Sequence, residues 1–183
     1  MRIVGGDNKG FRFQPPRNIP ARPTTDFAKE GLFNILNNQF YFDEISFLDL
    51  FAGTGSISYE MFSRGCRDIT SVELSSKMIK FIKEVSNSLN IDNHRIIQDD
   101  VFKYLDKAYK SFDVIFAGPP YPLENIDDLP DAVMKSNILN KDGWFILETS
   151  QMHNYKDHPN LHRLKNYGQT HFWIFSHEAN KEK

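Results

Sequence analysis

The sequence predicts a single α/β domain built around a mostly parallel β-sheet. From residue 45 onward, short apolar runs alternate with longer segments of helical periodicity, which is typical of parallel strands joined by crossover helices. The chain has 183 residues, enough for one domain with a sizeable core but too few for two complete ones. Because 40% of the residues are hydrophobic and 14% are aromatic, the composition excludes a disordered chain.

The first expected element is a β-hairpin over residues 2–14, with glycines in its turn. A connector with several prolines follows it, and a helix then begins at Thr24 or Thr25, since either threonine can cap it. This organisation divides the chain into an N-terminal hairpin and connector, residues 1–24, and a main domain, residues 25–183.

The main domain is expected to alternate strands and helices. Strands are expected at residues 45–50, 68–73, 95–98, 112–117 and 143–149. Helices are expected between them, at residues 56–64, 76–89, 101–107 and 127–137. Residues 161–175 are expected to add a final hairpin to the edge of the sheet. Ligands of such sheets bind beyond the carboxyl ends of the strands, so the residues found there are the candidates for a site.

Charge is distributed unevenly along the chain. The net charge is −2, yet residues 1–24 hold five basic residues against a single aspartate. The basic residues are Arg2, Lys9, Arg12, Arg17 and Arg22. A local basic arm can attract phosphates even when the whole protein is acidic. The alternative is a solvated, partly flexible terminus whose arginines make no specific contact, and charge alone leaves both possibilities open.

Several classes of protein are excluded by composition. The single cysteine, Cys66, rules out an internal disulfide, and no apolar run reaches the length of a signal peptide or a membrane span. The six histidines show no spacing suited to metal ligation. We therefore expect a soluble, cytoplasmic monomer without a metal ion, in which Cys66 is buried rather than reactive.

The loop after the first expected strand has the features of a cofactor-binding loop. Asp49 lies just ahead of Phe51 and Ala52, and Gly53-Thr54-Gly55 follows where the chain turns from strand to helix. Glycines at such a turn allow the backbone to come close to a ligand. A Gly-x-Gly turn alone is weak evidence, because many doubly wound proteins need small residues there for packing.

The end of the second strand strengthens this interpretation. Glu73, followed by Leu74, lies 20 residues after Gly53, where a carboxylate accepts hydrogen bonds from ribose hydroxyls. This arrangement fits any cofactor that contains adenosine. Ser58 occupies the third glycine position of a dinucleotide fingerprint, so a nicotinamide enzyme is disfavoured.

The third strand also ends in acidic residues. Asp99 and Asp100 precede Val101, and we favour Asp100 as the carboxylate that would face an adenine amino group. The alternative is that either aspartate only caps the helix beginning at Val101, a common role of this residue type.

The fourth strand ends in Gly118-Pro119-Pro120-Tyr121. Paired prolines fix an extended backbone and remove two N–H donors, leaving carbonyl acceptors beside an aromatic ring. Such a segment suits a flat base that carries an amino group. The alternative is a rigid loop that closes the end of the sheet.

Together these motifs resemble the bacterial small-subunit (16S) ribosomal RNA guanine-N2 methyltransferase family, the RsmD type. The resemblance covers nearly the whole chain, because Met1-Arg2-Ile3-Val4-Gly5-Gly6 and Arg22-Pro23-Thr24 look like the family's leader and Tyr167-Gly168 like its final hairpin. The glycine loop indicates class I methyltransferases broadly, and Pro-Pro-Tyr indicates those that act on amino groups. The leader narrows the match to this family.

The resemblance implies a class I, Rossmann-like methyltransferase fold for residues 25–183, with seven strands in a mostly parallel sheet, and an N-terminal β-hairpin that grips RNA. It implies S-adenosyl-L-methionine as cofactor, bound by Asp49, Phe51, Ala52, Gly53, Thr54, Gly55, Glu73, Leu74, Asp100 and Val101. The catalytic residues would be Gly118, Pro119, Pro120 and Tyr121. They would act on guanine N2 in small-subunit ribosomal RNA, either free or in the small ribosomal subunit. Tyr121 would stack on the extruded base, and Arg2, Lys9, Arg12, Arg17 and Arg22 would contact the RNA backbone.

One position departs from the family. Its fourth motif begins with Asp, or with Asn in related amino methyltransferases, where this chain has Gly118. Losing one polar group at a reaction centre can cost about 2–4 kcal/mol of transition-state stabilisation. Another group could substitute, a water could fill the space, or the enzyme could be slow or inactive. Two alternatives stay open. Pro-Pro-Tyr also serves amino and amide acceptors, which allows an amino methyltransferase acting on DNA adenine or protein glutamine. The loss of the acid at Gly118 allows an RNA-binding assembly factor with weakened catalysis.

Overall fold

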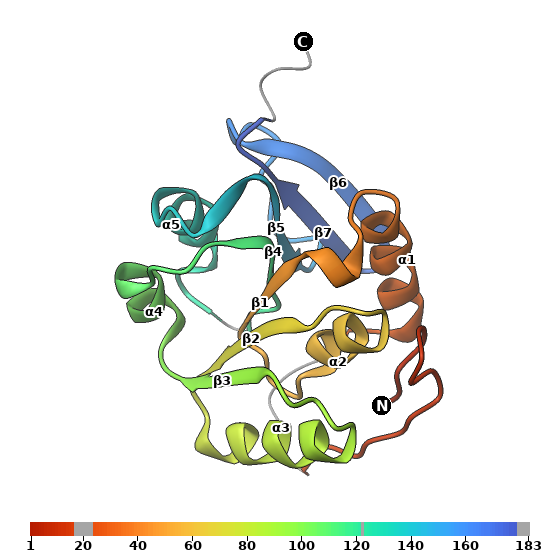
Figure 1. Ribbon diagram of the computed structural model, residues 1–183. Coiled ribbons are helices and arrows are strands. Elements are labelled where there is room, and N and C mark those ends of the chain that lie inside the picture. Colours follow the sequence, from red (N-terminus) through yellow and green to blue (C-terminus); the bar gives the residue numbers. More distant parts are fainter. Residues whose placement is uncertain (17–23, 122, 179–183) are drawn as a thin grey trace.

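The computed structural model describes residues 1–16, 24–121 and 123–178, and its central feature is one seven-stranded sheet (Figure 1). The strands are β1 (Ser46–Leu50), β2 (Asp68–Glu73), β3 (His94–Gln98), β4 (Phe112–Ala117), β5 (Leu139–Thr149), β6 (Leu161–Tyr167) and β7 (Thr170–Phe175). Their order is β3-β2-β1-β4-β5-β7-β6. The first five strands are parallel, and β7, which pairs antiparallel with both β5 and the edge strand β6, runs in the opposite direction. This confirms the predicted fold, including the final hairpin.

Helices cover both faces of this sheet (Figure 1). They are α1 (Asp26–Asn37), α2 (Ser56–Ser63), α3 (Ser76–Ser88), α4 (Val101–Lys107) and α5 (Leu129–Lys135), with short 3-10 helices at Phe42–Glu44 and Ile126–Asp128. Their starts follow from capping side chains, because Thr25 and Ser75 accept hydrogen bonds from backbone N–H groups at the starts of α1 and α3. Of the two threonines that could begin α1, the cap is Thr25.

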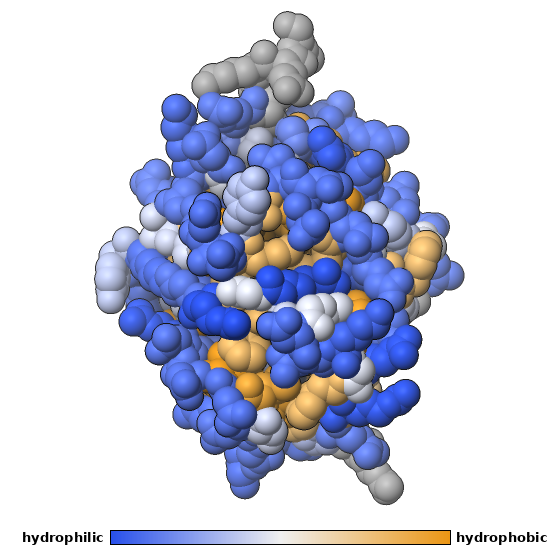
Figure 2. Space-filling model, turned by 45° about the vertical axis from the view of Figure 1, so that its right-hand side comes forward, coloured by the Kyte–Doolittle hydropathy of each residue, from blue (hydrophilic) through white to orange (hydrophobic). Residues whose placement is uncertain are grey.

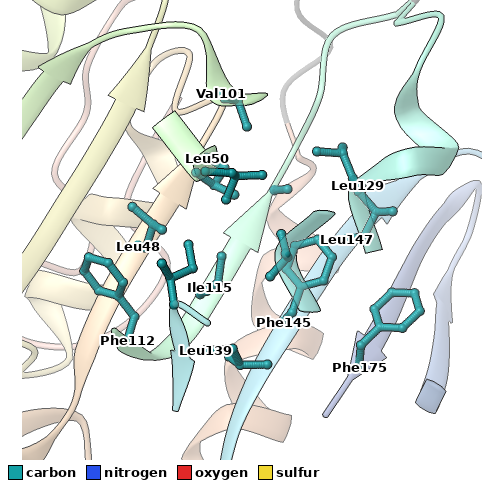
Figure 3. Packing of buried hydrophobic residues seen from close by; sticks show 14 of the residues in the cluster. Leu48, Leu50, Val101, Phe112, Ile115, Leu129, Leu139, Phe145, Leu147 and Phe175 are labelled. Atoms are coloured by element: carbon teal, nitrogen blue, oxygen red, sulfur yellow. The ribbon is translucent and has the colours of Figure 1, made fainter. Parts of the chain in front are cut away.

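Alternate residues of the central strands point into two separate hydrophobic layers. On one face, Leu48, Ile115 and Phe145 pack with residues of α4 and α5 (Figure 3). On the other face, Phe47, Val114 and Ile146 pack with residues of α1 and α2. Burial on both faces explains why the strands appear in the sequence as nearly continuous apolar runs. It also holds the carboxyl ends of β1, β4 and β5 rigidly side by side.

The fifth strand is longer than predicted. It begins at Leu139 instead of residue 143, because a bulge lets Phe112 pair with Leu139 while Val114 pairs with Trp144. Gly143 suggested a strand boundary, but it lies inside β5, where a side chain would come within 2.7 Å of a backbone oxygen of β4. The preceding helix, α5, is correspondingly shorter than the expected 127–137.

The N-terminal hairpin is present and is packed on the main domain. Its pairing amounts to one isolated antiparallel bridge between Arg2 and Arg12, where the sequence suggested two short strands. Phe13 is buried, with its ring centroid 5.2 Å from that of Tyr59 on α2 and 6.4 Å from that of Phe81 on α3. The hairpin therefore belongs to the hydrophobic core, which argues against a detached terminus for these residues.

A buried ionic cluster joins this hairpin to α1 and α2. Lys29 donates from Nζ to the Arg2 carbonyl at 2.6 Å and lies 3.4 Å from Glu60 Oε1. The same Glu60 oxygen accepts a 2.5 Å hydrogen bond from the Val4 N–H group. Arg64 Nε lies 3.5 Å from the other Glu60 oxygen, a pair that an i, i+4 spacing favours.

The surface seen in Figure 2 is largely hydrophilic, with smaller hydrophobic patches between the polar side chains. None of the helices in the described part of the chain is long and apolar enough to span a membrane. Across residues 1–16, 24–121 and 123–178, no three His, Cys, Asp or Glu side chains are grouped so that they could hold a metal ion. Cys66 is buried, and burial raises the pKa of its thiol to about 12, so it is protonated at neutral pH as expected of a structural cysteine.

Candidate active site

A cavity of about 290 Å³ lies beyond the carboxyl ends of β1, β4 and β5. The structure brings two of the predicted motifs together in its lining. The first contributes Asp49, Phe51, Ala52, Gly53 and Thr54, and the second contributes Gly118, Pro119 and Tyr121. The cavity therefore lies at the carboxyl ends of the parallel strands, where the sequence predicted a site.

The glycine loop has a backbone that leaves room for a ligand. Gly53 has φ of +54°, and a Cβ added there would meet no heavy atom closer than the Phe51 carbonyl oxygen at 3.8 Å. Packing inside the protein therefore does not require a glycine at this position, and the open space faces the cavity. Phe51 itself has φ of +59°, a strained conformation for a residue with a side chain.

Gly55 has a different reason to be glycine. Its φ is +76°, and an added Cβ would lie 2.5 Å from the hydroxyl oxygen of Tyr59. This glycine lies just before α2, allowing the chain to turn closely from the loop into the helix.

Asp49 is buried at the base of the cavity. Its carboxylate accepts a 2.6 Å hydrogen bond from the hydroxyl of Ser58. Burial raises the pKa of Asp49 to about 7, the hydrogen bond from Ser58 opposes this rise, and the charges of Glu73 and Glu148 add to it. The site thus concentrates acidic groups, and a bound cation would stabilise the ionised form of Asp49.

A chain of buried polar groups continues from Asp49 away from the cavity. The Ser58 hydroxyl lies 2.8 Å from that of Ser71, which lies 2.7 Å from His94 Nε2. His94 Nδ1 in turn lies 2.8 Å from the Ser86 hydroxyl on α3. Burial lowers the pKa of His94 to about 4, so the ring is neutral at neutral pH. Ser58, which disfavoured a dinucleotide site in the sequence, is therefore a structural partner of Asp49.

Glu73 braces the glycine loop. One carboxylate oxygen accepts a 2.8 Å hydrogen bond from the Gly53 N–H group, and the other accepts from Ser75 at the same distance. Leu74, between these contacts, is exposed. Glu73 and Leu74 lie beside the loop but outside the lining of the 290 Å³ cavity, so their contacts with adenosine stay predictions.

Asp100 has the capping role that the sequence offered as an alternative. Its side chain accepts a hydrogen bond from the Lys103 N–H group and begins α4, in which Val101 is buried. Asp99 lies 2.5 Å from Lys107 Nζ, and this hydrogen bond holds the pKa of the carboxyl below its usual value. Both roles are structural, and an adenine contact of Asp100 stays a prediction.

The fourth motif frames the opposite side of the cavity. Pro119 is buried, whereas Pro120 and Tyr121 are exposed. The Tyr121 hydroxyl accepts a hydrogen bond from the Ser150 N–H group, which holds the ring at the end of β5. Since 42% of Tyr121 is exposed, this tyrosine is not a core residue.

The sequence missed the contribution of β5 to the site. Glu148, Thr149 and Ser150 line the cavity, and so does Thr24, which the sequence indicated as a helix cap or as part of the leader but not as a site residue. The rule that ligands bind at the carboxyl ends of parallel strands pointed to Glu148, but no motif drew attention to it.

The predicted RNA contacts fall into three groups. Lys9 and Arg12 are exposed on the hairpin. Arg2 is engaged with Asp26, its Nε lying 2.7 Å from the carboxylate. Arg17 and Arg22 lie outside the described residues.

The family described as Conserved hypothetical protein 95, which is the RsmD family, matches residues 1–176. The chain belongs to this family. Within it, the Buchnera aphidicola (strain Bp) protein named ribosomal RNA small subunit methyltransferase D is 30% identical over 148 residues. That alignment covers 81% of this chain and 75% of the relative.

Solved structures agree with the RsmD-family fold. A hypothetical protein of Thermus thermophilus is 24% identical and superposes with a TM-score of 0.85. The alignment covers 96% of this chain and 99% of that protein. A more distant neighbour, SMU.776 complexed with SAH, is 20% identical with a TM-score of 0.65, over 80% of this chain and 49% of the neighbour. The chain is thus a class I methyltransferase of the RsmD family.

Proposed function

We propose that this RsmD-family methyltransferase transfers the methyl group of S-adenosyl-L-methionine to the exocyclic N2 of a guanine in small-subunit ribosomal RNA. The observation that carries the proposal is the joining of the glycine loop and the Gly118–Tyr121 motif around one cavity. In-line methyl transfer requires a donor and an acceptor held on facing sides of one site.

The cavity suits the cofactor in charge and in shape. S-adenosyl-L-methionine carries a sulfonium and an ammonium group, both cationic, and Asp49, Glu73 and Glu148 lie at or beside the cavity. The open space over Gly53 would be filled by any side chain, which fits a cofactor lying against the loop backbone. SMU.776, which shares the fold, is described as a complex with SAH. When bound, the cofactor supplies an electrophilic methyl group, and these residues would hold it.

The acceptor side suits a planar base with an amino group. Tyr121 offers an exposed ring fixed by Ser150, on which an extruded base could stack. The carbonyls of Gly118 and Pro119 are acceptors for N–H groups, and Pro119 has no N–H of its own to repel them. Guanine N2 provides such N–H donors.

The hairpin supplies the basic surface expected for RNA. Lys9 and Arg12 project from residues 1–14, which are fixed to α1 and α2 by the Lys29–Glu60 cluster. Pro15 and Pro16, next in the chain, line the cavity, so the basic segment leads directly to the site. Residues 1–24 would thus serve as the RNA-gripping segment and residues 25–183 as the methyltransferase domain. The relative from Buchnera carries a name that specifies ribosomal RNA.

The deciding experiment compares ribosomal RNA nucleosides, by mass spectrometry, from cells with and without this protein. We expect one N2-methylguanosine of the small subunit to disappear in the deletion strain and to return on complementation. Unchanged N2-methylguanosine would contradict the assigned reaction. Labelled-cofactor assays on naked RNA, small subunits, DNA and protein then separate this activity from methylation of adenine or glutamine.

A further inference from the structure

Gly118 leaves a defined space in the acceptor side of the cavity. A Cβ added to this residue would lie 3.2 Å from Phe116 Cε1, which is tight, and 3.9 Å from Glu148 Oε2. A carboxylate from the neighbouring strand therefore lies beside the position from which the usual Asp or Asn side chain would extend.

The register of the sheet explains this proximity. β4 and β5 are parallel, with Phe116 opposite Ile146 and Ala117 opposite Leu147. The next residues, Gly118 just after β4 and Glu148 within β5, consequently lie at the same level, and both line the cavity.

A hydrogen bond fixes the Glu148 carboxylate. The Thr24 hydroxyl donates to Glu148 Oε2 at 2.6 Å, from the residue before the cap of α1. The same oxygen is the one nearest to Gly118. The group is therefore positioned by the fold before any substrate arrives, as a reaction centre requires.

We propose that Glu148 supplies the carboxylate that Gly118 lacks, accepting a hydrogen bond from the target amino group and taking its proton. This inference rests on the proposed function. In the step, the nitrogen lone pair forms the new N–C bond to the methyl group, and the electron pair of the broken S–C bond stays on sulfur, which becomes a neutral thioether. The nitrogen then loses one proton to Glu148, which passes it to solvent.

Glycine at position 118 and glutamate at position 148 are then complementary. An aspartate at 118 would press on the Phe116 ring and bring a second carboxylate close to the first. Two carboxylates sharing one site repel each other, and one of them would be held protonated. Beside Gly118 the chain therefore has one carboxylate, that of Glu148, which belongs to β5 and not to the segment after β4.

The test is a cycle of purified variants assayed with S-adenosyl-L-methionine and small-subunit RNA or subunits lacking the modification. We expect Glu148→Gln to lower kcat about 100-fold, because the amide cannot take a proton. Gly118→Asp alone should also be slower than the unaltered protein, owing to repulsion. The double variant G118D/E148Q should regain at least about tenfold over E148Q, because its new carboxylate lies beside an uncharged amide.

Thr24→Val is the matched control for a structural role of Glu148. It removes the hydrogen bond between Thr24 and Glu148 but leaves the carboxylate, so we expect a loss below about tenfold. Equal losses in T24V and E148Q, or E148Q activity at least half that of the unaltered protein, would overturn the inference while the proposed function stood. An unaltered protein that binds the cofactor but methylates no RNA would overturn the proposed function and this inference with it.

Discussion

Lys29 Nζ lies 3.4 Å from Glu60 Oε1, and both side chains are almost completely buried between the N-terminal hairpin, α1 and α2. Lys29 also donates to the Arg2 carbonyl and the Ser56 hydroxyl, and the Val4 N–H group donates to Glu60. This pair links the basic hairpin to the helix that follows the glycine loop, and its removal should be felt in the stability of the whole protein.

Glu60→Ala should lower the free energy of unfolding by about 3–5 kcal/mol, because the buried Lys29 charge then keeps only the partly exposed Asp26 carboxylate, 3.7 Å away, as an ionic partner. Urea unfolding of both proteins measures the difference. Lys80→Ala, which removes an exposed ion pair on α3, is the control and should change stability by less than about 1 kcal/mol. A loss of the same small size in Glu60→Ala would show that the buried pair is not needed.

Asp49 should make the stability depend on pH. Burial raises its pKa to about 7, above the value of roughly 3.9 in an unfolded chain. Between about pH 4 and pH 7 the folded state therefore keeps a proton that the unfolded state has released, so the free energy of unfolding falls as the pH rises. The stabilisation from the protonated carboxyl is fully present below about pH 4 and is lost as the pH rises through 7. Between pH 5 and 8 the unaltered protein should lose about 2.5 kcal/mol relative to Asp49→Asn. If the free energies of unfolding of the two proteins, measured in urea, change equally with pH, the raised pKa of Asp49 is contradicted.

Gly53→Ala should separate cofactor binding from folding. The added methyl group meets no protein atom within 3.8 Å, but φ of +54° is unfavourable for alanine, so we expect a loss of about 1–2 kcal/mol in stability. The methyl group would also occupy space over the loop, and calorimetric titration should show S-adenosyl-L-methionine binding weakened at least about tenfold.

Gly10→Ala is the matched control for this experiment. Gly10 also has a positive φ, and a Cβ there would likewise meet nothing within 4 Å, but it lies in the turn of the hairpin. Its stability loss should be similar and its cofactor affinity unchanged. If both variants lose affinity equally, the effect comes from backbone strain and not from the cavity.

Replacing Lys9 and Arg12 together by alanine should weaken RNA binding without changing cofactor affinity. Loss of two phosphate contacts makes the negative slope of log affinity against log salt shallower by about 1.5. Filter binding or fluorescence anisotropy at several salt concentrations measures this slope. Lys135→Ala, on α5 and paired with Asp131, is the control and should leave the slope unchanged. An unchanged slope in K9A/R12A would remove the hairpin from the RNA-binding surface.

Most of the fold could be predicted because burial on both faces gives each central strand a continuous apolar run. The start of β5 could not, because the bulge that extends it back to Leu139 depends on how Phe112 and Val114 pair across the sheet. Local sequence at Gly143 indicates a boundary, and only the partner strand shows otherwise.

The candidate site was predictable where one loop carries the whole motif, as around Gly53. It was not predictable where residues of two different strands form one part of the site. Glu148 and Gly118 are 30 residues apart in the sequence, and only the register of β4 and β5 makes them neighbours. Likewise, the aspartate at position 100 could be a cap or a ligand, and only its bond to Lys103 established the first role.

The hydrogen-bonded series from Asp49 to His94 gives this protein an internal spectroscopic reporter. If Asp49 is ionised, Ser58 donates to it, Ser71 donates to Ser58, and the neutral His94 ring must donate from Nε2 while Nδ1 accepts from Ser86. When a protonated Asp49 donates to Ser58 instead, every donor in the series reverses and the imidazole proton lies on Nδ1. The tautomer of one remote histidine, distinguishable by ¹⁵N chemical shift, therefore registers the charge at the floor of the methyl-transfer site.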